Sequence, residues 1–182
     1  MLDLSTYFPL KESRAHEVCG PSALSLAFAS AEQAEGSVMW ISENWRAEQI
    51  NPSGFCAYMD PRNLLTSKVK DQNEGMAVAE ESLRSGAVRI TIIELTKPLS
   101  FIAGRRLQLA AERGRSTGLC IIPEGMGNNA AESRWRCAPL FDANFGGGDS
   151  TLQRWEIIKN KSGTLNAWNV RWDAETRRVI VV

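Results

Sequence analysis

The chain has 182 residues, of which 43% are apolar and 23% charged, the composition of an ordinary globular domain. Its 21 lysines and arginines balance 21 acidic residues, which excludes a bulk positive field that would draw the whole protein onto nucleic acid or a membrane. The longest apolar runs are far shorter than a membrane span, and residues 1–18 lack the basic start and apolar core of a signal peptide, so we expect a cytoplasmic protein.

The first two thirds of the chain alternate apolar strands with amphipathic helices. Apolar stretches predict the strands Ala15–Gly20, Ser37–Ser42, Val88–Leu95 and Gly118–Ile122, and Leu64–Val69 is predicted as a further strand. Helical spacing, with glycine stops, predicts helices from Pro21 to the stop at Gly36, over Asp71–Ser85, and over Leu99–Arg113. The stretch Asn44–Asp60 contains turn signals and is predicted as a loop. This order predicts an α/β fold with a mostly parallel central sheet flanked by helices.

After Pro123 the pattern changes to strands joined by short polar segments. The predicted strands are Ser133–Leu140, Leu152–Lys159, Leu165–Asp173 and Arg177–Val182, and the predicted loops are Glu124–Glu132 and Asn144–Asp149. We therefore predict a single domain over residues 1–182. It comprises an N-terminal segment at 1–14, an αβ core at 15–122, and an antiparallel extension of the same sheet at 133–182.

The residues suited to nucleophilic or metal chemistry are few. The four cysteines are widely spaced and form no CxxC pair, so they predict reduced, buried thiols rather than a zinc site. His16 is the only histidine, and any Ser-His or Cys-His mechanism must use it. It stands at the start of an apolar strand beside Glu17, a position that favours a structural histidine over a catalytic one.

The stretch HEVCGPSALSLAF, residues 16–28, reads as a strand, a tight turn and a helix, which is where many α/β proteins bind a phosphate. A Walker A loop counted from Gly20 requires glycine, lysine and a hydroxyl residue at the positions that Ser25, Leu26 and Ala27 occupy. Residues 15–45 contain no lysine or arginine at all. The sequence therefore predicts a strand–helix turn with no nucleotide cofactor and no catalytic residue.

Two carboxylates stand at the ends of predicted strands, Glu43 after SVMWIS and Glu94 within VRITIIEL. Strand ends of this kind form the active-site edge of many α/β folds, so a metal pair is one alternative. The other is that, without a phosphate loop, these carboxylates have no metal to hold, and we expect no metal site.

With the strand order in place, the chain resembles the ATPase core of the RecA recombinase, and more specifically the ImuA family. These are RecA-like accessory proteins of bacterial error-prone translesion synthesis. The stretches that carry the resemblance are His16–Gly20, Val38–Ile41, Glu80–Val88, Arg105–Glu112, Ser133–Pro139 and Trp155–Asp173.

The resemblance implies a RecA-type core and a role in the damage-induced SOS response. It implies a Y-family-polymerase-like partner, and RecA and a replicative-type polymerase as further partners. It also implies that Gly20, Pro21 and Ser25 are a vestigial phosphate loop, so that ATP-driven strand exchange is not expected. The N-terminus before the first strand is short, so filament assembly is not expected either.

Three features are candidates for partner or DNA contacts. Arg105 and Arg106 lie off the apolar stripe of their helix and either form a binding face or are simply solvated. Arg134, Trp135 and Arg136 either stack on bases or pack into the sheet. Trp168 and Trp172 share one face of a strand, with Trp155 on its neighbour, and this face is either core or an exposed interface.

The function that the sequence favours is therefore a non-enzymatic RecA-like adaptor in translesion DNA synthesis. Two alternatives stay open at this point: a RecA-type ATPase or recombinase, and a module that binds single-stranded DNA.

Overall fold

The computed structural model describes residues 3–143, 150–161 and 163–182. The strands are β1 (Ala15–Cys19), β2 (Val38–Glu43), β3 (Leu64–Val69), β4 (Ile90–Glu94), β5 (Thr117–Ile121), β6 (Ser133–Pro139), β7 (Gln153–Asn160), β8 (Asn166–Asp173) and β9 (Arg178–Val181). The helices are α1 (Ala23–Gln33), α2 (Pro52–Phe55), α3 (Gln72–Ser85) and α4 (Phe101–Gly114), with 3₁₀ turns at Leu4–Thr6 and Pro61–Asn63.

The nine strands of the described residues form one mixed sheet in the order β3-β2-β4-β5-β1-β6-β7-β8-β9. The pairs from β3 to β6 are parallel, and the pairs β6–β7, β7–β8 and β8–β9 are antiparallel. The predicted α/β class, with its parallel sheet and antiparallel C-terminal extension, is confirmed. One detail is corrected: β6 pairs in parallel with β1, so the antiparallel part begins at β7 rather than at residue 133.

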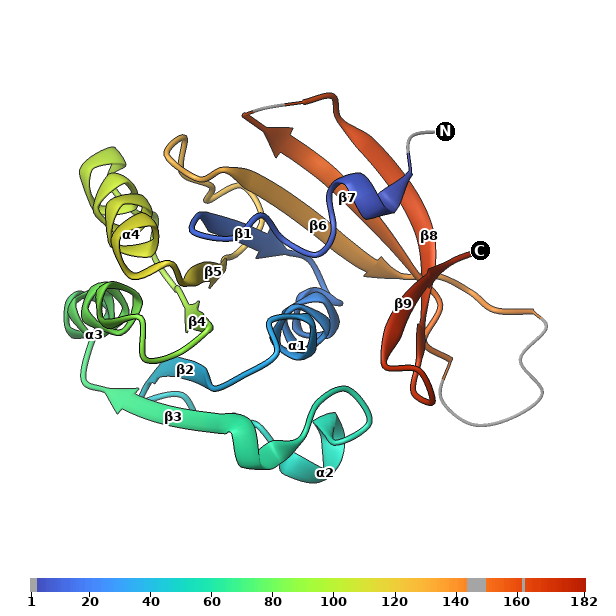
Figure 1. The fold of residues 1–182 in the computed structure, drawn as a ribbon, viewed down its shortest axis with the longest axis horizontal. Coiled ribbons are helices and arrows are strands. Elements are labelled where there is room, and N and C mark those ends of the chain that lie inside the picture. The colour runs from blue at the N-terminus through green and yellow to red at the C-terminus, as the bar shows by residue number, and fades with distance from the viewer. Residues whose placement is uncertain (1–2, 144–149, 162) are drawn as a thin grey trace.

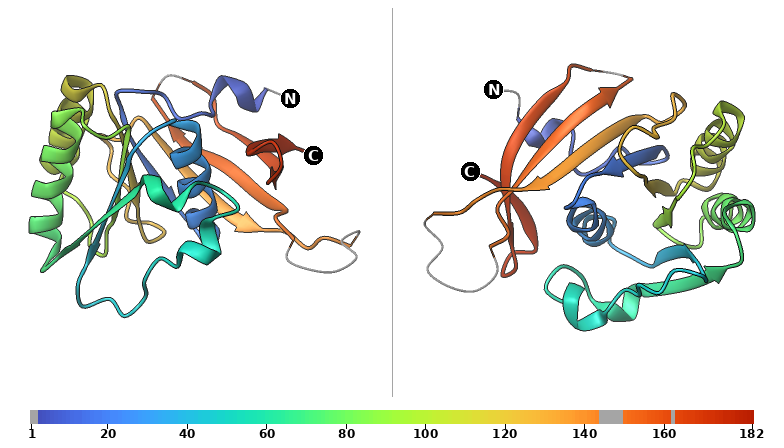
Figure 2. Two further views of the ribbon diagram at one scale, coloured as in Figure 1. Left: turned by 60° about the horizontal axis from the view of Figure 1, so that its bottom comes forward. Right: turned by 180° about the vertical axis from the view of Figure 1, so that it is seen from behind.

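Helices cover both faces of the sheet. Figure 1 shows the sheet curving around α1, with β3 at one end of the curve and β9 at the other. A hydrogen bond from the Gln33 side chain to the Arg177 carbonyl, 3.0 Å long, links the end of α1 to the turn before β9. The other face carries α3 and α4, which lie side by side on the side remote from the C-terminal strands (Figure 2).

The core beneath α1 is largely aromatic, because the side chains between this one helix and the curved sheet must fill a wide space. Phe28 of α1 stacks on Trp40 and Phe55, with ring centroids 5.1 and 4.8 Å apart. On the C-terminal side, Trp135 lies against Trp155 and Trp168, at 6.3 and 6.0 Å. Contacts between large rings bury much apolar area for each residue that folding orders.

Several helices and strands begin and end where the sequence predicts. The Asp71 side chain accepts a hydrogen bond from the Glu74 amide at the start of α3, and Gly86 ends that helix in the left-handed conformation at φ +65°. The predicted β3 boundaries are confirmed. Two details differ: α1 begins at Ala23, two residues after Pro21, and the predicted loop at 44–60 contains α2.

Helical spacing predicts an apolar stripe for α4 that is partly wrong; it consists of Leu99, Ile102, Ala103, Leu107 and Ala110. Ile102 is 73% exposed, whereas Gly104 and Gln108 face the core. Gln108 is buried because its amide group bonds both backbone groups of Ala15 and the carbonyl of Ala130. Because Gln108 must reach these buried backbone groups, the side of α4 that packs on the sheet is not the most apolar side of the helix.

The predicted loop at Asn144–Asp149 lies outside the described residues. Among the helices that the structure describes, none combines the length and the apolar character required to cross a membrane.

Candidate functional site at the carboxyl edge of the parallel strands

The turn between β1 and α1 is closed against β6. Gly20 adopts φ +94°, and a Cβ at this position would lie 2.4 Å from the carbonyl oxygen of Cys137. The same oxygen accepts a hydrogen bond of 3.0 Å from the Ser22 amide. Gly20 is therefore required here by the close approach of a neighbouring strand.

The backbone amides of this turn are already used. Pro21 has no N–H, the Ala23 amide donates to the Gly20 carbonyl at 3.1 Å, and the Ser25 amide donates to the Ser22 carbonyl at 3.1 Å. The Ser25 hydroxyl accepts a hydrogen bond of 2.9 Å from the side chain of Gln153 on β7. A phosphate cradle requires several free N–H groups pointing at one spot, and this turn does not provide that arrangement.

A cleft of about 700 Å³ opens beside the turn, at the carboxyl ends of the parallel strands. Four segments line it: the β1–α1 turn with the first half of α1, the connection between β2 and β3, the end of β4, and the end of β5 with the residues after it. Its walls are mostly apolar, and Leu24 of α1, which is half exposed, reaches into it. This edge is where ligands of open α/β sheets bind, but here the wall near α1 favours apolar groups rather than a phosphate.

The polar side chains at this edge are paired with one another. Glu94 accepts a hydrogen bond of 2.7 Å from the Trp40 indole through Oε1, and its Oε2 lies 2.9 Å from Nη1 of Arg46. The oxygens of Glu43 accept hydrogen bonds from Thr96 at 2.8 Å and from the Trp45 indole at 2.7 Å. The two carboxylates therefore have protein partners, and the described residues contain no group of three His, Cys, Asp or Glu that could hold a metal ion.

His16 is buried in a chain of hydrogen bonds. Its Nε2 lies 2.9 Å from the Lys11 carbonyl and must donate, so the neutral ring accepts at Nδ1 from the Ser133 hydroxyl at 2.7 Å. Ser133 in turn accepts from the Trp135 indole at 3.0 Å. Burial lowers the pKa of His16 to about 4, although the Lys11 carbonyl and the charge of Glu132 act in the opposite direction. Both ring nitrogens are therefore occupied by hydrogen bonds within the protein.

The cysteines are all free thiols. Burial raises the pKa of Cys19, Cys120 and Cys137, so these three are protonated at neutral pH and are poor nucleophiles. Cys56 is exposed, contrary to the prediction that all four are buried.

Of the two alternatives for Arg134, Trp135 and Arg136, packing into the sheet holds for Trp135. Trp135 is 1% exposed, so it has no free ring face on which a base could stack. Arg134 forms an ion pair of 2.7 Å with the buried carboxylate of Glu17 on β1. Arg136 points to the surface, where Glu156 binds it at 2.5 Å and raises its pKa by hydrogen bonding.

The C-terminal tryptophans are core residues rather than an exposed interface. Trp155 and Trp168 are paired across β7 and β8, and together with Trp172 they are buried beneath α1 and the N-terminal segment. The Trp172 indole donates to the Ala57 carbonyl at 2.8 Å, and the Trp155 indole donates to the Gln153 side chain at 2.9 Å. Alternation along the strand places Trp168 and Trp172 on one shared face, and burial of that face removes these residues as partner contacts.

Arg105 and Arg106 are exposed on α4, as predicted, but they differ in pairing. Nη2 of Arg106 lies 2.6 Å from Oε2 of Glu80 on α3. Arg105 has no ion pair or hydrogen bond from its side chain within the described part of the chain. Of the predicted contact residues, Arg105 is thus the one that is both exposed and uncompensated.

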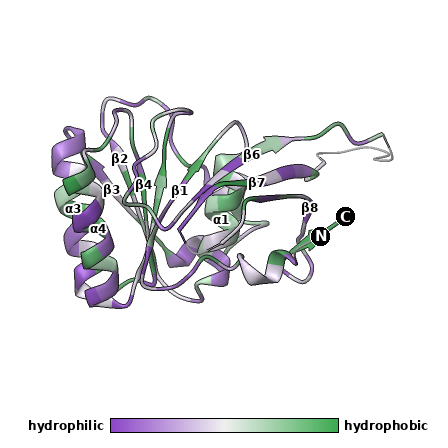
Figure 3. Cartoon of the chain, turned by 90° about the horizontal axis from the view of Figure 1, so that it is seen from above, coloured by the Kyte–Doolittle hydropathy of each residue, from purple (hydrophilic) through white to green (hydrophobic). Residues whose placement is uncertain are grey.

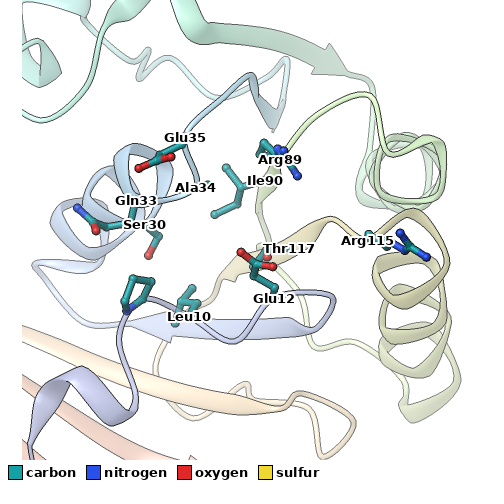
Figure 4. A pocket seen from close by; sticks show the side chains of 11 residues that line it. Leu10, Glu12, Ser30, Gln33, Ala34, Glu35, Arg89, Ile90, Arg115 and Thr117 are labelled. Carbon is teal, nitrogen blue, oxygen red and sulfur yellow. The ribbon is translucent and has the colours of Figure 1, made fainter.

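A smaller pocket of about 200 Å³ lies at the opposite edge, where the parallel strands begin (Figure 4). Its lining includes Glu12, Glu35, Arg89 and Arg115, whose formal charges cancel. Figure 4 shows the Arg115 side chain beside α4, directed away from the others. The buried hydroxyl of Ser30 on the wall has no hydrogen-bond partner in the described structure. The balanced charges select no ionic ligand, so we assign no function to this pocket.

Sequence reasoning missed two buried polar pairings, His16 with Ser133 and Glu17 with Arg134. Both join β1 to β6, strands more than a hundred residues apart in the chain. A signal was present in the opposite charges of Glu17 and Arg134, each near the start of an apolar strand, but their pairing follows only from the strand order.

No family model and no curated protein matches this chain.

Proposed function

We propose that this protein is a non-enzymatic, RecA-like accessory protein of damage-induced, error-prone translesion DNA synthesis. In this role it acts with a Y-family-polymerase-like partner and a replicative-type polymerase, and it bridges RecA and the polymerase-like partner. The proposal takes its biological setting from the resemblance to the ImuA family. The physical support comes from the site at the carboxyl edge of the sheet.

The observation that carries the proposal is the closed β1–α1 turn. The Cys137 carbonyl fills the space above Gly20, and the amides of Ser22, Ala23 and Ser25 already donate to backbone carbonyls. A nucleotide triphosphate with its magnesium requires free amides, a lysine and a hydroxyl at this place. Their absence from the turn favours a binding role over ATP-driven chemistry, and therefore disfavours the ATPase or recombinase alternative.

The alternative of a single-stranded DNA module receives less support. Such modules combine aromatic side chains on which bases stack with a basic groove. Here Trp135 is buried, and Arg134 is neutralised by Glu17. The two side chains that suggested base stacking, Trp135 and Arg134, therefore make contacts within the protein instead.

One experiment tests both parts of the proposal. Titration calorimetry of the full chain with Mg·ATP is expected to show no binding, and titration with the purified polymerase-like partner is expected to show saturable binding in the micromolar range or tighter. Micromolar ATP binding would overturn the non-enzymatic assignment. Absence of binding to both the polymerase-like partner and RecA would overturn the accessory role.

A further inference from the structure

The outer side of α4 carries large apolar side chains that folding does not bury. Phe101, Ile102 and Leu109 are 61%, 73% and 50% exposed. Helical geometry places Ile102 and Leu109 two turns apart, about 10 Å along one side of the helix, with Arg105 between them. We define the α4 outer face as Phe101, Ile102, Arg105, Leu109 and Arg113. Figures 1 and 3 place α4 at the outside of the molecule, with no described segment over that side.

The α4 outer face is also positively charged, although the chain as a whole has no net charge. Within the described residues, the side chains of Arg105 and Arg113 form no ion pair. The acidic residue on the same side of the helix, Glu112, lies 3.6 Å from Nη1 of Arg14 and is thereby compensated. Two uncompensated cations therefore lie among three exposed apolar side chains.

A groove of about 500 Å³ runs beside this face, between α3 and α4. Met76, Leu99 and Ala103 form its apolar lining, and the ion pair of Arg106 with Glu80 borders it. The α4 outer face thus adjoins a recess that can accept an apolar side chain from a partner.

Neither packing nor helix stability accounts for apolar residues at these exposed positions. Phe101 and Ile102 occupy the first turn of α4, where acidic residues would favour the helix dipole and none is present. A β-branched isoleucine at an exposed helical position adds nothing to helix stability, because its rotamers are restricted there. Exposed apolar patches of this kind, bordered by charge, are typical of interaction sites.

We propose that the α4 outer face docks an acidic amphipathic helix of a partner protein, an inference that rests on the proposed function. The partner's apolar residues would cover Ile102 and Leu109, and its carboxylates would meet Arg105 and Arg113. The straight spacing of the two aliphatic anchors along one helix suits another helix lying beside it. Aliphatic anchors offer nothing to the phosphates of nucleic acid, and two arginines beside a glutamate are too few charges for stable binding to a lipid surface.

The test measures binding of the full chain to the polymerase-like partner, and to RecA, for matched pairs of surface variants. Arg105→Glu and Ile102→Ser change the α4 outer face. Arg178→Glu and Ile180→Ser are the controls, because both residues are exposed on β9, an edge strand remote from α4, and Arg178 has no ion pair in the described structure. Circular dichroism and thermal midpoints establish that all four variants are folded.

We expect Arg105→Glu and Ile102→Ser each to weaken partner binding by about tenfold or more, and the controls to change it by less than about twofold. Wild-type affinity should also fall as salt rises. If the partner binds the α4 variants as tightly as the wild type, the inference is wrong while the proposed function stands. If the wild type binds no partner, both are overturned. Binding of anionic vesicles or single-stranded DNA that Arg105→Glu abolishes would assign the face to lipid or nucleic acid instead.

Discussion

Lowering the pH from 7 to 4 should destabilise this protein through His16 in particular. In the folded chain burial holds the pKa of this histidine at about 4, whereas in the unfolded chain it is near 6.5. Below pH 6.5 the unfolded state therefore binds a proton at His16 that the folded state does not bind. The contribution of His16 to the free energy of unfolding is fully present above pH 6.5 and is lost as the pH falls toward 4. The loss is about 1.4 kcal/mol for each pH unit, or about 3 kcal/mol in all.

Burial is the main reason why the folded state resists protonation of His16, and the hydrogen bonds at Nδ1 leave no acceptor for a second ring proton. The Ser133 hydroxyl already accepts from the Trp135 indole and donates to Nδ1 of His16. A proton on Nδ1 would turn the ring into a second donor toward Ser133, and the ring is only 2% exposed, so water cannot compensate. The favourable charge of Glu132 is partly offset by Lys11 and Arg14.

The assay compares the wild type with His16→Gln, both without a histidine tag, by urea unfolding between pH 7 and pH 4. Carboxylates titrate in both proteins, so their contribution cancels in the difference between the two free energies of unfolding. That difference should move by about 3 kcal/mol in favour of the variant as the pH falls. Because the chain has one histidine, its Cε1–H resonance should also titrate with a midpoint near 4. A midpoint near 6.5, or parallel pH profiles for the two proteins, would refute the reasoning.

Three further predictions concern stability, each checked by urea unfolding at pH 7. Gly20→Ala should cost about 2–4 kcal/mol, because the new methyl group would meet a backbone carbonyl of β6 at a positive φ; a loss below 1 kcal/mol would show that β6 moves aside easily. Glu17→Gln should cost about 3–5 kcal/mol by leaving Arg134 without its buried partner, whereas Glu156→Gln at the surface should cost about 1 kcal/mol or less; equal losses would contradict this contrast. Ser30→Ala should be neutral or stabilising by about 1 kcal/mol, since the lost hydroxyl has no partner in the described structure; a clear destabilisation would reveal an unseen partner.

The elements that the sequence predicts well are those with local signals. α3 follows from an apolar stripe bounded by Asp71 and Gly86, so its signals lie within a few residues of its ends, and the bounds of β3 match the predicted strand Leu64–Val69. The pairing of β1 with β6 has no local signal, because it depends on where the chain returns after more than a hundred residues. The sequence therefore predicts the class of fold but not that Glu17 meets Arg134.

The face of α4 was mispredicted for a different physical reason. Periodicity identifies the most apolar stripe of a helix, and a stripe containing Ile102 satisfies it. In the fold, small residues and Gln108 face inward, since Gly104 lets the Asn128 side chain approach closely and Gln108 satisfies the backbone of Ala15. Ile102 is left outside as a result. Departures of this kind, where an apolar residue is exposed and a polar one is buried, are where functional surfaces are found.

The closed turn differs from a phosphate loop in length as well as in side chains. Only Pro21 and Ser22 separate Gly20 from the start of α1, whereas a Walker A loop places four residues before its second glycine. As a consequence the position of the lysine falls on Leu26, which is completely buried, and that of the hydroxyl falls on Ala27, which is also completely buried. Introducing the missing side chains would bury a charge rather than create a nucleotide site. Binding a nucleotide here would require a longer turn and the removal of β6 from above Gly20, whereas docking a partner on α4 requires no change in the fold.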